Sequence, residues 1–403
     1  MKDRKIFRKS PLMSYVLISV MFIWLGTLFY GCSKGTSGGK PIRIIPDFGN
    51  ETSVGLAELA DSVTYIPLGN QVRVGTITRL KFAGRRIYIE ANNRGIIAFD
   101  IKGNYLNLIG KLGEGLREIS SINDFTIDPA TNEVYILDKV QIKVFSGSGK
   151  FIRSMEAPVE EYFPGINFFN NKIYLFDTYS EGKAKYNWIV TDTLAHKLGE
   201  KLNPVKPFKA NLSFNTNPYF EAQNKLFYWD YLNDTIYSIR RTGYRAAYVF
   251  ANGPNRLTPG DLWNTNMKPE LKAPILTSVT ESGRYLILYY LWIGRNQSSI
   301  CAFDNKSTEF RLINTREGIH KDDGIRNDWD GGVPFLPKTT VKYNSRDYLA
   351  GWIYTFQLKA FVARDTFRNY TPVFPEKKQE IEQLADSLDI ADNPVIMLVK
   401  LKK

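Results

Sequence analysis

The sequence predicts an all-β fold, a six-bladed β-propeller, with one amphipathic helix near the C-terminus. The main observation is a sequence motif that occurs six times: a tight polar turn with a charged residue, followed by a strand that carries an aromatic side chain. The aromatic residues are Tyr88, Tyr135, Tyr174, Phe227, Tyr285 and Tyr348. They are roughly 39 to 63 residues apart, near the period of propeller blades, in which each repeat forms one small sheet. Six copies therefore predict six blades.

The first two repeats show the expected plan of a blade, which is four short strands in a row. The predicted strands cover residues 77–82, 86–90, 95–100 and 105–109 in the first repeat, and 124–128, 133–138, 143–145 and 151–155 in the second. Each run is rich in β-branched and aromatic residues. Glycine or asparagine lies between the runs of the first repeat and in the outer hairpin of the second, at residues 147–150. The later repeats are less regular, which predicts longer loops there, where binding sites are often found.

The two ends of the mature chain supply the strands that would close the ring. Residues 63–68 and 394–399 are both suited to strands, and pairing them would remove the free sheet edges of an open ring. Before the second run, apolar residues recur at helical spacing after Pro375 and end before Asn393. These residues, Ile381, Leu384, Ala385 and Leu388, predict an amphipathic helix on the edge of the propeller.

The N-terminus resembles an export signal. Residues 1–10 are rich in lysine and arginine, residues 11–31 carry no charge, and Cys32 follows the small residue Gly31. A cysteine at this point resembles a bacterial lipobox, so we expect residues 1–31 to be removed and Cys32 to be lipidated. An uncleaved anchor helix is the alternative, because about 20 apolar residues can span a bilayer. Residues 32–41 then form a flexible Gly/Ser tether, and residues 42–403 form the propeller.

Charge and cysteine content limit the classes of partner. The formal net charge of +12 is partly due to the N-terminal segment, so the domain itself is mildly basic. In an exported protein this excess favours contact with anionic lipid or polysaccharide, or simple solubility, and no nucleic-acid partner is expected. Cys301 is the only other cysteine, so the domain has no internal disulfide.

A cluster of acidic and amide side chains lies in the sixth repeat. Asp323, Asp328 and Asp330 fall within a few residues of one another, next to glycines. Their oxygens could bind Ca²⁺, which prefers six to eight oxygen ligands, although the spacing differs from that of a helix-loop-helix calcium site. The alternatives are turns held by side-chain-to-backbone hydrogen bonds, which we favour, and catalysis.

Other catalytic chemistry has little support. His196 and His320 are the only histidines, whereas zinc and iron sites usually draw on several imidazoles. The chain has no Gly-x-Ser-x-Gly nucleophile motif. A hydrolytic carboxylate pair stays open, because its members need only the right separation in space. We therefore predict no catalytic residue.

Aromatic residues are the leading candidates for ligand contact. Trp229, Tyr231, Trp292 and Trp329 are placed by the pattern just after strands or in loops, where flat rings can stack on sugars or clamp a peptide. Packing in the core is the alternative for each of them. For aromatic residues inside strands, such as Tyr88 and Tyr135, packing is the favoured interpretation.

The chain resembles the NHL-like six-bladed β-propeller lipoproteins of Bacteroidetes, most of which have no assigned function. The likeness runs from about Leu59 to Leu401. It rests on residues 61–68, Phe99-Asp100 with Gly103 and residues 108–110, residues 233–237, residues 327–332 with Phe335 and Pro337, and residues 393–395. One loop departs from the family, since Leu116 and Arg117 replace the usual proline and glycine. The resemblance implies the fold and an envelope location but no reaction.

These observations predict a lipid-anchored, non-enzymatic propeller that binds an envelope glycan, peptide or protein. Its tether has no acidic residue, unlike those of many surface-exported Bacteroidetes lipoproteins, so we expect it on the outer membrane facing the periplasm. The alternative is a carbohydrate- or peptide-active hydrolase or lyase with acidic residues in the funnel and possible calcium dependence. A third hypothesis is a purely structural part of an outer-membrane complex.

Overall fold

The computed structural model divides into two units, Met1–Lys40 and Pro41–Lys403, and the second contains the described elements of secondary structure. The structure describes residues 40–91, 95–159, 161–178, 182–208, 218–230, 232–241, 243–253, 256–260, 273–317 and 324–403. Cys32 and the whole leader therefore lie outside the described residues.

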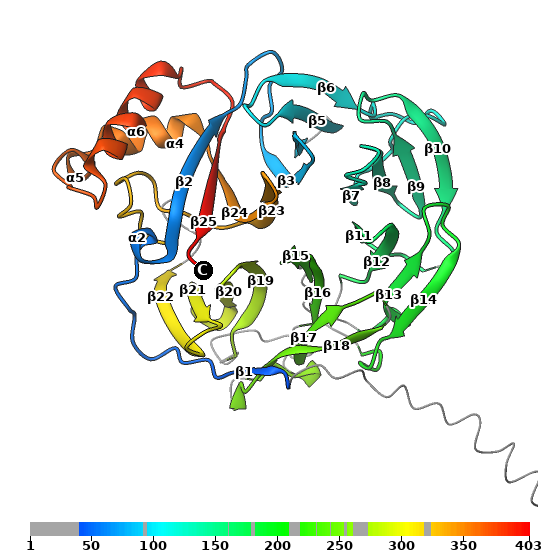
Figure 1. Ribbon diagram of the computed structural model, residues 1–403. Coiled ribbons are helices and arrows are strands. Elements are labelled where there is room, and N and C mark those ends of the chain that lie inside the picture. Colours follow the sequence, from blue (N-terminus) through cyan, green and yellow to red (C-terminus); the bar gives the residue numbers. More distant parts are fainter. Residues whose placement is uncertain are drawn as a thin grey trace, which may run out of the picture. The chain divides into compact units, whose positions relative to one another are not determined.

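The second unit is a ring of six sheets, as predicted (Figure 1). Each blade has four antiparallel strands, and blade four carries a fifth, β1 (Ile42–Ile44), which pairs parallel with its outer strand β18 (Tyr244–Phe250). The strands of blades one to three are β3 (Ile77–Ala83), β4 (Arg86–Ala91), β5 (Gly95–Asp100), β6 (Tyr105–Ile109), β7 (Asp124–Ile127), β8 (Val134–Asp138), β9 (Gln141–Phe145), β10 (Phe151–Glu156), β11 (Gly165–Phe169), β12 (Lys172–Phe176), β13 (Tyr186–Thr191) and β14 (Lys197–Leu202). Those of blades four to six are β15 (Tyr219–Ala222), β16 (Lys225–Asp230), β17 (Asn233–Ile239), β18 (Tyr244–Phe250), β19 (Ile275–Ser282), β20 (Tyr285–Trp292), β21 (Gln297–Asp304), β22 (Glu309–Glu317), β23 (Thr339–Tyr343), β24 (Arg346–Ile353), β25 (Val395–Leu401) and β2 (Ala60–Pro67). The first strand of each blade faces the centre of the ring (Figure 1).

The six repeated turns share one backbone conformation. In each turn between the first and second strands of a blade, at least one residue has a positive φ. These residues are Gly84, Asn132, Asn170 with Asn171, Gln223 with Asn224, Gly283, and Asn344 with Ser345. Tight hairpins need this left-handed conformation because it matches the twist of the paired strands, and glycine and asparagine adopt it at least cost. The polar turn of the repeated motif thus supplies the positive φ that the hairpin needs.

The repeated aromatic residues belong to the core. All six are in the second strand of their blade and are buried, from Tyr88 in blade one to Tyr348 in blade six. Tyr88, for example, packs in one cluster with Phe125 and Val134 of the next blade. A second strand is covered by neighbouring blades on both faces, so it carries apolar residues on both. Interblade packing therefore holds the ring together.

The ring closes between the two ends of the described chain, as predicted. β2 is the outermost strand of blade six and pairs antiparallel with β25, with Val63 opposite Val399. Asn393, just before β25, fixes the junction with blade one. Its side chain accepts a hydrogen bond from Val74 N and donates to the carbonyls of Gly69 and Val72.

Helices cover the outside of blade six (Figure 1). The predicted helix is α6 (Pro375–Ser387), which buries Ile381 and Ala385. Three more helices were not predicted: α2 (Leu56–Leu59), α4 (Thr355–Val362) and α5 (Asp365–Arg368). α4, α5 and α6 share a hydrophobic cluster with strands of blade six. Within the described parts of the chain, no helix has both the length and the apolar character needed to cross a membrane.

Candidate functional site

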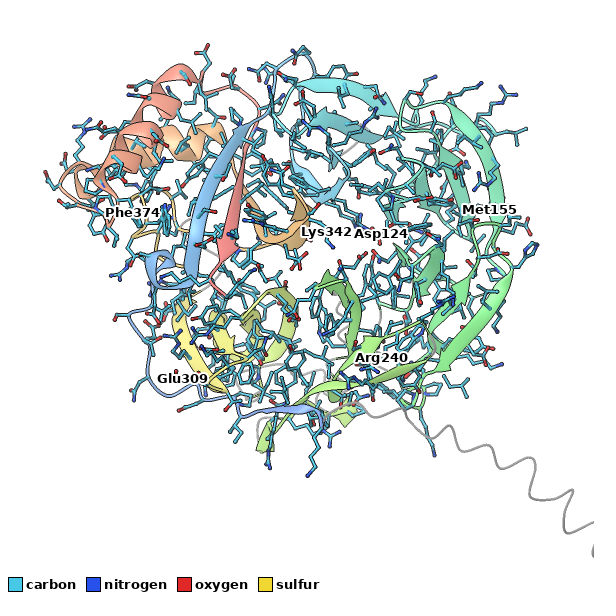
Figure 2. The ribbon with its side chains drawn as sticks, viewed as in Figure 1. Asp124, Met155, Arg240, Glu309, Lys342 and Phe374 are labelled. Atoms are coloured by element: carbon cyan, nitrogen blue, oxygen red, sulfur yellow. The ribbon has the colours of Figure 1, made fainter. Side chains whose placement is uncertain are left out.

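A cavity of about 350 Å³ lies at the centre of the ring and is the candidate site. Residues of five blades line it, from the inner strands β3, β7, β11, β15 and β23 and the turns that follow them. The polar and charged side chains of the lining are Lys81, Thr126, Asn167, Tyr219, Glu221, Asn224, Thr339, Thr340, Lys342, Ser345 and Asp347. Figure 2 labels Lys342 and Asp124 next to each other near the ring centre. A cavity of this size is at the lower end of the range for small-molecule sites.

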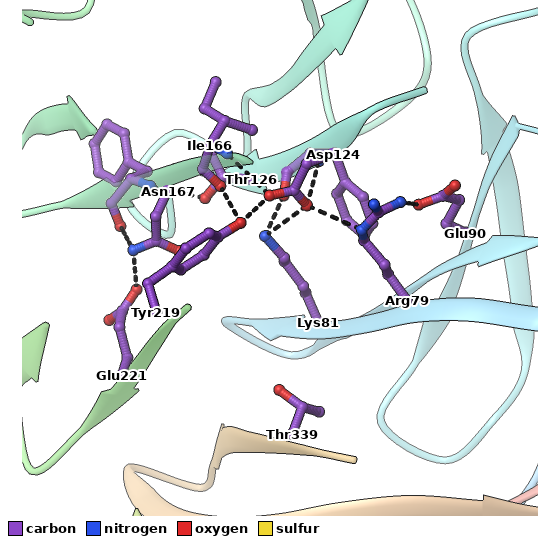
Figure 3. Close-up of polar contacts among 12 residues, drawn as sticks. Arg79, Lys81, Glu90, Asp124, Thr126, Ile166, Asn167, Tyr219, Glu221 and Thr339 are labelled. Atoms are coloured by element: carbon purple, nitrogen blue, oxygen red, sulfur yellow. Dashed lines mark hydrogen bonds and ion pairs between the residues drawn. The ribbon is translucent and has the colours of Figure 1, made fainter. Parts of the chain in front are cut away.

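The carboxylate of Asp124 connects four blades beside this cavity (Figure 3). Asp124 begins β7 of blade two and is only 2 % exposed. Its oxygens accept hydrogen bonds from Ile166 N of blade three at 2.9 Å and from the Tyr219 hydroxyl of blade four. Blade one contributes Arg79 Nε at 3.4 Å and Lys81 Nζ at 3.3 Å. We call these five residues the Asp124 cluster.

The Asp124 cluster is electrostatically compensated. Arg79 also pairs with Glu90 of β4 at 2.5 Å, so two cations meet two carboxylates. Lys81 additionally donates to the carbonyl of Phe125 and lies over the Phe125 ring at 5.2 Å. Burial, followed by the negative charge of Asp124, raises the pKa of Tyr219 well above its ordinary value, so this hydroxyl stays a donor. A buried charge network is stable only when its members are paired in this way.

Three other charged side chains of the cavity have neutral hydrogen-bond partners in place of ion pairs. Glu221 of β15 accepts a 2.7 Å hydrogen bond from Asn167 Nδ2 of β11, a neutral partner, and is exposed within the cavity (Figure 3). Lys342 of β23 is exposed and donates to Asn224 Oδ1. Asp347 of β24 accepts a 2.8 Å hydrogen bond from Gln223 N. Charged groups of both signs therefore remain available to a ligand.

Glu281 lies behind this layer, between blades four, five and six. Its carboxylate accepts hydrogen bonds from Gln223 Nε2 and, at 3.4 Å, from the Tyr248 hydroxyl. Its backbone exchanges hydrogen bonds with Thr340 of β23. Burial raises the pKa of Glu281 to about 7. Glu281 thus supports the wall of the cavity, and its raised pKa lies near neutral pH.

Two of the four candidate aromatic residues are inside strands and buried in the core, which corrects the expectation that they lie just after strands or in loops. Trp229 is in β16 and packs against Phe220. Trp292 ends β20, where its indole N–H donates to Ser299 Oγ and its ring contacts Phe48. Both strands are second strands with two covered faces, so a ring at their ends is buried as well. Neither residue lines the central cavity.

The other two aromatic candidates are also remote from the cavity or outside the described residues. Trp329 is half-buried, and its ring lies 4.3 Å from that of Phe374 at the helical side of blade six. Tyr231 is outside the described residues. The structure therefore does not bring the predicted aromatic residues together into one surface.

The acidic candidates of the sixth repeat bind protein donors. Asp328 Oδ1 accepts a hydrogen bond from Ala57 N at 2.7 Å. Asp330 accepts hydrogen bonds from the Tyr65 hydroxyl at 2.9 Å and Gly332 N at 2.8 Å, and burial raises its pKa. These bonds attach the segment before β23 to the start of the domain.

The described part of the chain contains no preformed metal-binding cluster. No group of three or more His, Cys, Asp or Glu side chains there is placed to hold an ion. Asp323 and His320 lie outside the described residues, so a calcium site that includes Asp323 stays a prediction. His196 is exposed on a turn, where Nδ1 lies 2.8 Å from Asp192 Oδ2.

Sequence reasoning missed the residues of the cavity. Arg79 and Lys81 alternate with Leu80 and Phe82 in a strand, and the same alternation places Glu221 between Phe220 and Ala222. This pattern was a usable signal, because the first strand of every blade must turn one face toward the ring centre. Charged residues at those positions mark the channel.

The comparisons with known proteins agree with the fold. The sequence matches the family described as "Domain of unknown function (DUF4934)" over residues 40–400, so the chain belongs to that family. No curated protein matches it. Among solved structures, a "putative exported protein" from Bacteroides fragilis is similar with a TM-score of 0.65 and 16% identity, covering 90% of this chain and 100% of that one.

Two other solved structures match with low scores. The RRP9 WD40 repeats match with a TM-score of 0.41 and 10% identity, covering 85% of this chain and 100% of that one. Glutaminyl cyclase from Myxococcus xanthus matches with a TM-score of 0.33 and 12% identity, covering 68% of this chain and 100% of that one.

Proposed function

We propose that this member of the DUF4934 family is an exported, lipid-anchored, non-enzymatic propeller of the cell envelope that binds a small polar ligand in its central cavity. The supporting observation is the cavity itself, which is lined by charged and amide side chains from five blades. Several of these side chains are fixed by bonds to neighbouring blades, as Asn167 and Asp347 are. Groups held in place before a ligand arrives lose little entropy when it binds.

The envelope location is supported by the leader-like residues 1–31 and by Cys32 after Gly31. The similar Bacteroides fragilis structure, whose name describes it as exported, is consistent with this location. The anchor would hold the propeller at the outer membrane, with the Gly/Ser-rich tether giving it reach. A periplasm-facing orientation is part of the proposal.

Lipid attachment predicts that Cys32→Ser releases the protein from the membrane fraction, because the thiol that carries the lipid is gone. Cell fractionation with immunodetection measures this, and mass spectrometry of the N-terminal peptide should show an acylated Cys32. Cys301→Ser is the matched control, because Cys301 is buried in β21 and cannot carry the anchor. An unmodified leader on the mature protein would contradict the proposal.

Ligand binding in the cavity predicts that filling it abolishes binding. Thr339 lines the cavity from β23, a strand that tolerates aromatic residues, so Thr339→Phe should remove a melting-temperature shift produced by any cavity ligand. Thermal shift assays of the purified full-length protein against envelope sugars, amino acids and short peptides measure this. Leu198→Phe on the exposed outer strand β14 is the control. If no compound shifts the wild-type protein, or if Thr339→Phe binds unchanged, the cavity is not the site.

A further inference from the structure

The charges that face the cavity differ in whether the protein already neutralises them. Lys81 is paired with Asp124, within the Asp124 cluster. Glu221, Asp347 and Lys342 form no ion pair, within 4.0 Å, with any of the described residues. Two carboxylates and one ammonium group are therefore left for an incoming molecule.

These three groups lie close enough to influence one another. Burial raises the pKa of Glu221 above its ordinary value. The hydrogen bond from Asn167 and the positive charges of Lys81 and Lys342 act in the opposite direction, and the negative charge of Asp347 adds to the rise. They come from β15, β23 and β24, in blades four and six, so they face the cavity from different sides. Figure 3 shows Glu221 on β15 and Thr339 on β23, both below the Asp124 cluster in this view.

The remaining lining combines apolar side chains of the inner strands, such as Phe220, with uncharged polar ones. Thr126, Asn167, Asn224 and Thr339 supply hydroxyl and amide groups. A long apolar ligand would leave these groups without hydrogen bonds, which costs free energy for each buried group. The volume of about 350 Å³ also favours a compact molecule.

We propose that the cavity binds a free amino acid or a dipeptide, with the ligand's ammonium group at Glu221 and Asp347 and its carboxylate at Lys342. The proposal deepens the proposed function by naming the ligand class, and it rests on that function. Because two carboxylates face one lysine, a ligand with a second positive charge is favoured. The expected order of affinity is L-lysine first, then L-alanine, then L-glutamate.

Isothermal titration calorimetry on the full-length protein tests this order with four probes: L-lysine, L-alanine, L-glutamate and cadaverine. Cadaverine has the two amines of lysine without its carboxylate, so it should bind more weakly than L-lysine. Glu221→Gln should weaken L-lysine binding by about tenfold or more, because a hydrogen bond to a charged group is lost. Lys342→Met should weaken L-lysine binding by a similar factor and leave cadaverine binding unchanged or improved.

Matched controls are available on α6, far from the cavity. Glu380→Gln and Lys377→Met change the same charges on exposed side chains and should leave every affinity unchanged. If neutral sugars bind in the cavity and neither Glu221→Gln nor Lys342→Met alters binding, the ligand class is wrong while the binding function stands. If no probe or sugar binds at all, the binding function itself is wrong.

Discussion

Replacing Asp124 by alanine is expected to lower the free energy of unfolding by about 1–3 kcal/mol, because it removes a buried carboxylate that accepts hydrogen bonds and ion pairs from three other blades. Arg79 and Lys81, which are both partly exposed, would lose a partner. Ile166 N and the Tyr219 hydroxyl would lose an acceptor at the same time. Urea-induced unfolding, followed by fluorescence, measures the loss.

Two further variants separate the contributions of charge and hydrogen bonding. Asp124→Asn keeps a side-chain oxygen that can accept from Ile166 N but removes the charge, so it should fall between wild type and Asp124→Ala. Asp365→Ala removes an exposed carboxylate at the start of α5 and should change stability by less than about 0.5 kcal/mol. A loss below about 1 kcal/mol in Asp124→Ala would show that the cluster does not join the blades.

Glu281→Gln is expected to stabilise the protein at pH 8 by as much as about 3 kcal/mol, the free energy that corresponds to the raised pKa of Glu281. The ordinary pKa of this carboxyl is 4.5, and burial raises its pKa to about 7 in the folded protein. The unfolded chain therefore loses the proton first as pH rises. The protonated Glu281 carboxyl therefore contributes to the free energy of unfolding. This contribution is complete below pH 4.5 and is lost as pH rises to about 7.

The measurement is the free energy of unfolding of wild type and Glu281→Gln between pH 4 and pH 8.5. The difference between the two should grow across the window from 4.5 to about 7 and then become constant. Glutamine keeps the oxygen that accepts from Gln223 Nε2, so the main change is the loss of titration. Glu376→Gln on α6 is a control with an acidic residue in a first helical turn. A difference that does not depend on pH would contradict the assignment.

The blades could be predicted from the sequence because their signals are local. A left-handed turn at Asn132 and an aromatic residue at Tyr135 fall within one hairpin, so a few consecutive residues specify it. The closing pair of β2 and β25 was also predictable, because both runs suit strands, β25 is strongly apolar, and the ring needs a final strand. α4 was not, because a short segment with Leu358, Phe361 and Val362 becomes helical through contacts with blade six.

The cavity could not be assembled from sequence alone. Asp124, Glu221 and Lys342 lie in separate repeats, and only the curvature of the ring brings them to one place. Glu221 between two apolar neighbours has the pattern of any half-exposed strand. The tryptophans were placed wrongly for a related reason: Trp229 and Trp292 end strands whose burial comes from neighbouring blades that are distant in sequence.

The pairing of β2 with β25 also sets the order in which the protein matures. Asp61 and Lys400 form an ion pair across 339 positions of the chain, so translation must be almost finished before blade six can assemble. During synthesis the nascent polypeptide keeps an unpartnered strand near its start, where chaperones can bind it. Any ribosome stall before residue 395 yields a product without its final strand, which gives proteolytic quality control a simple way to recognise incomplete molecules.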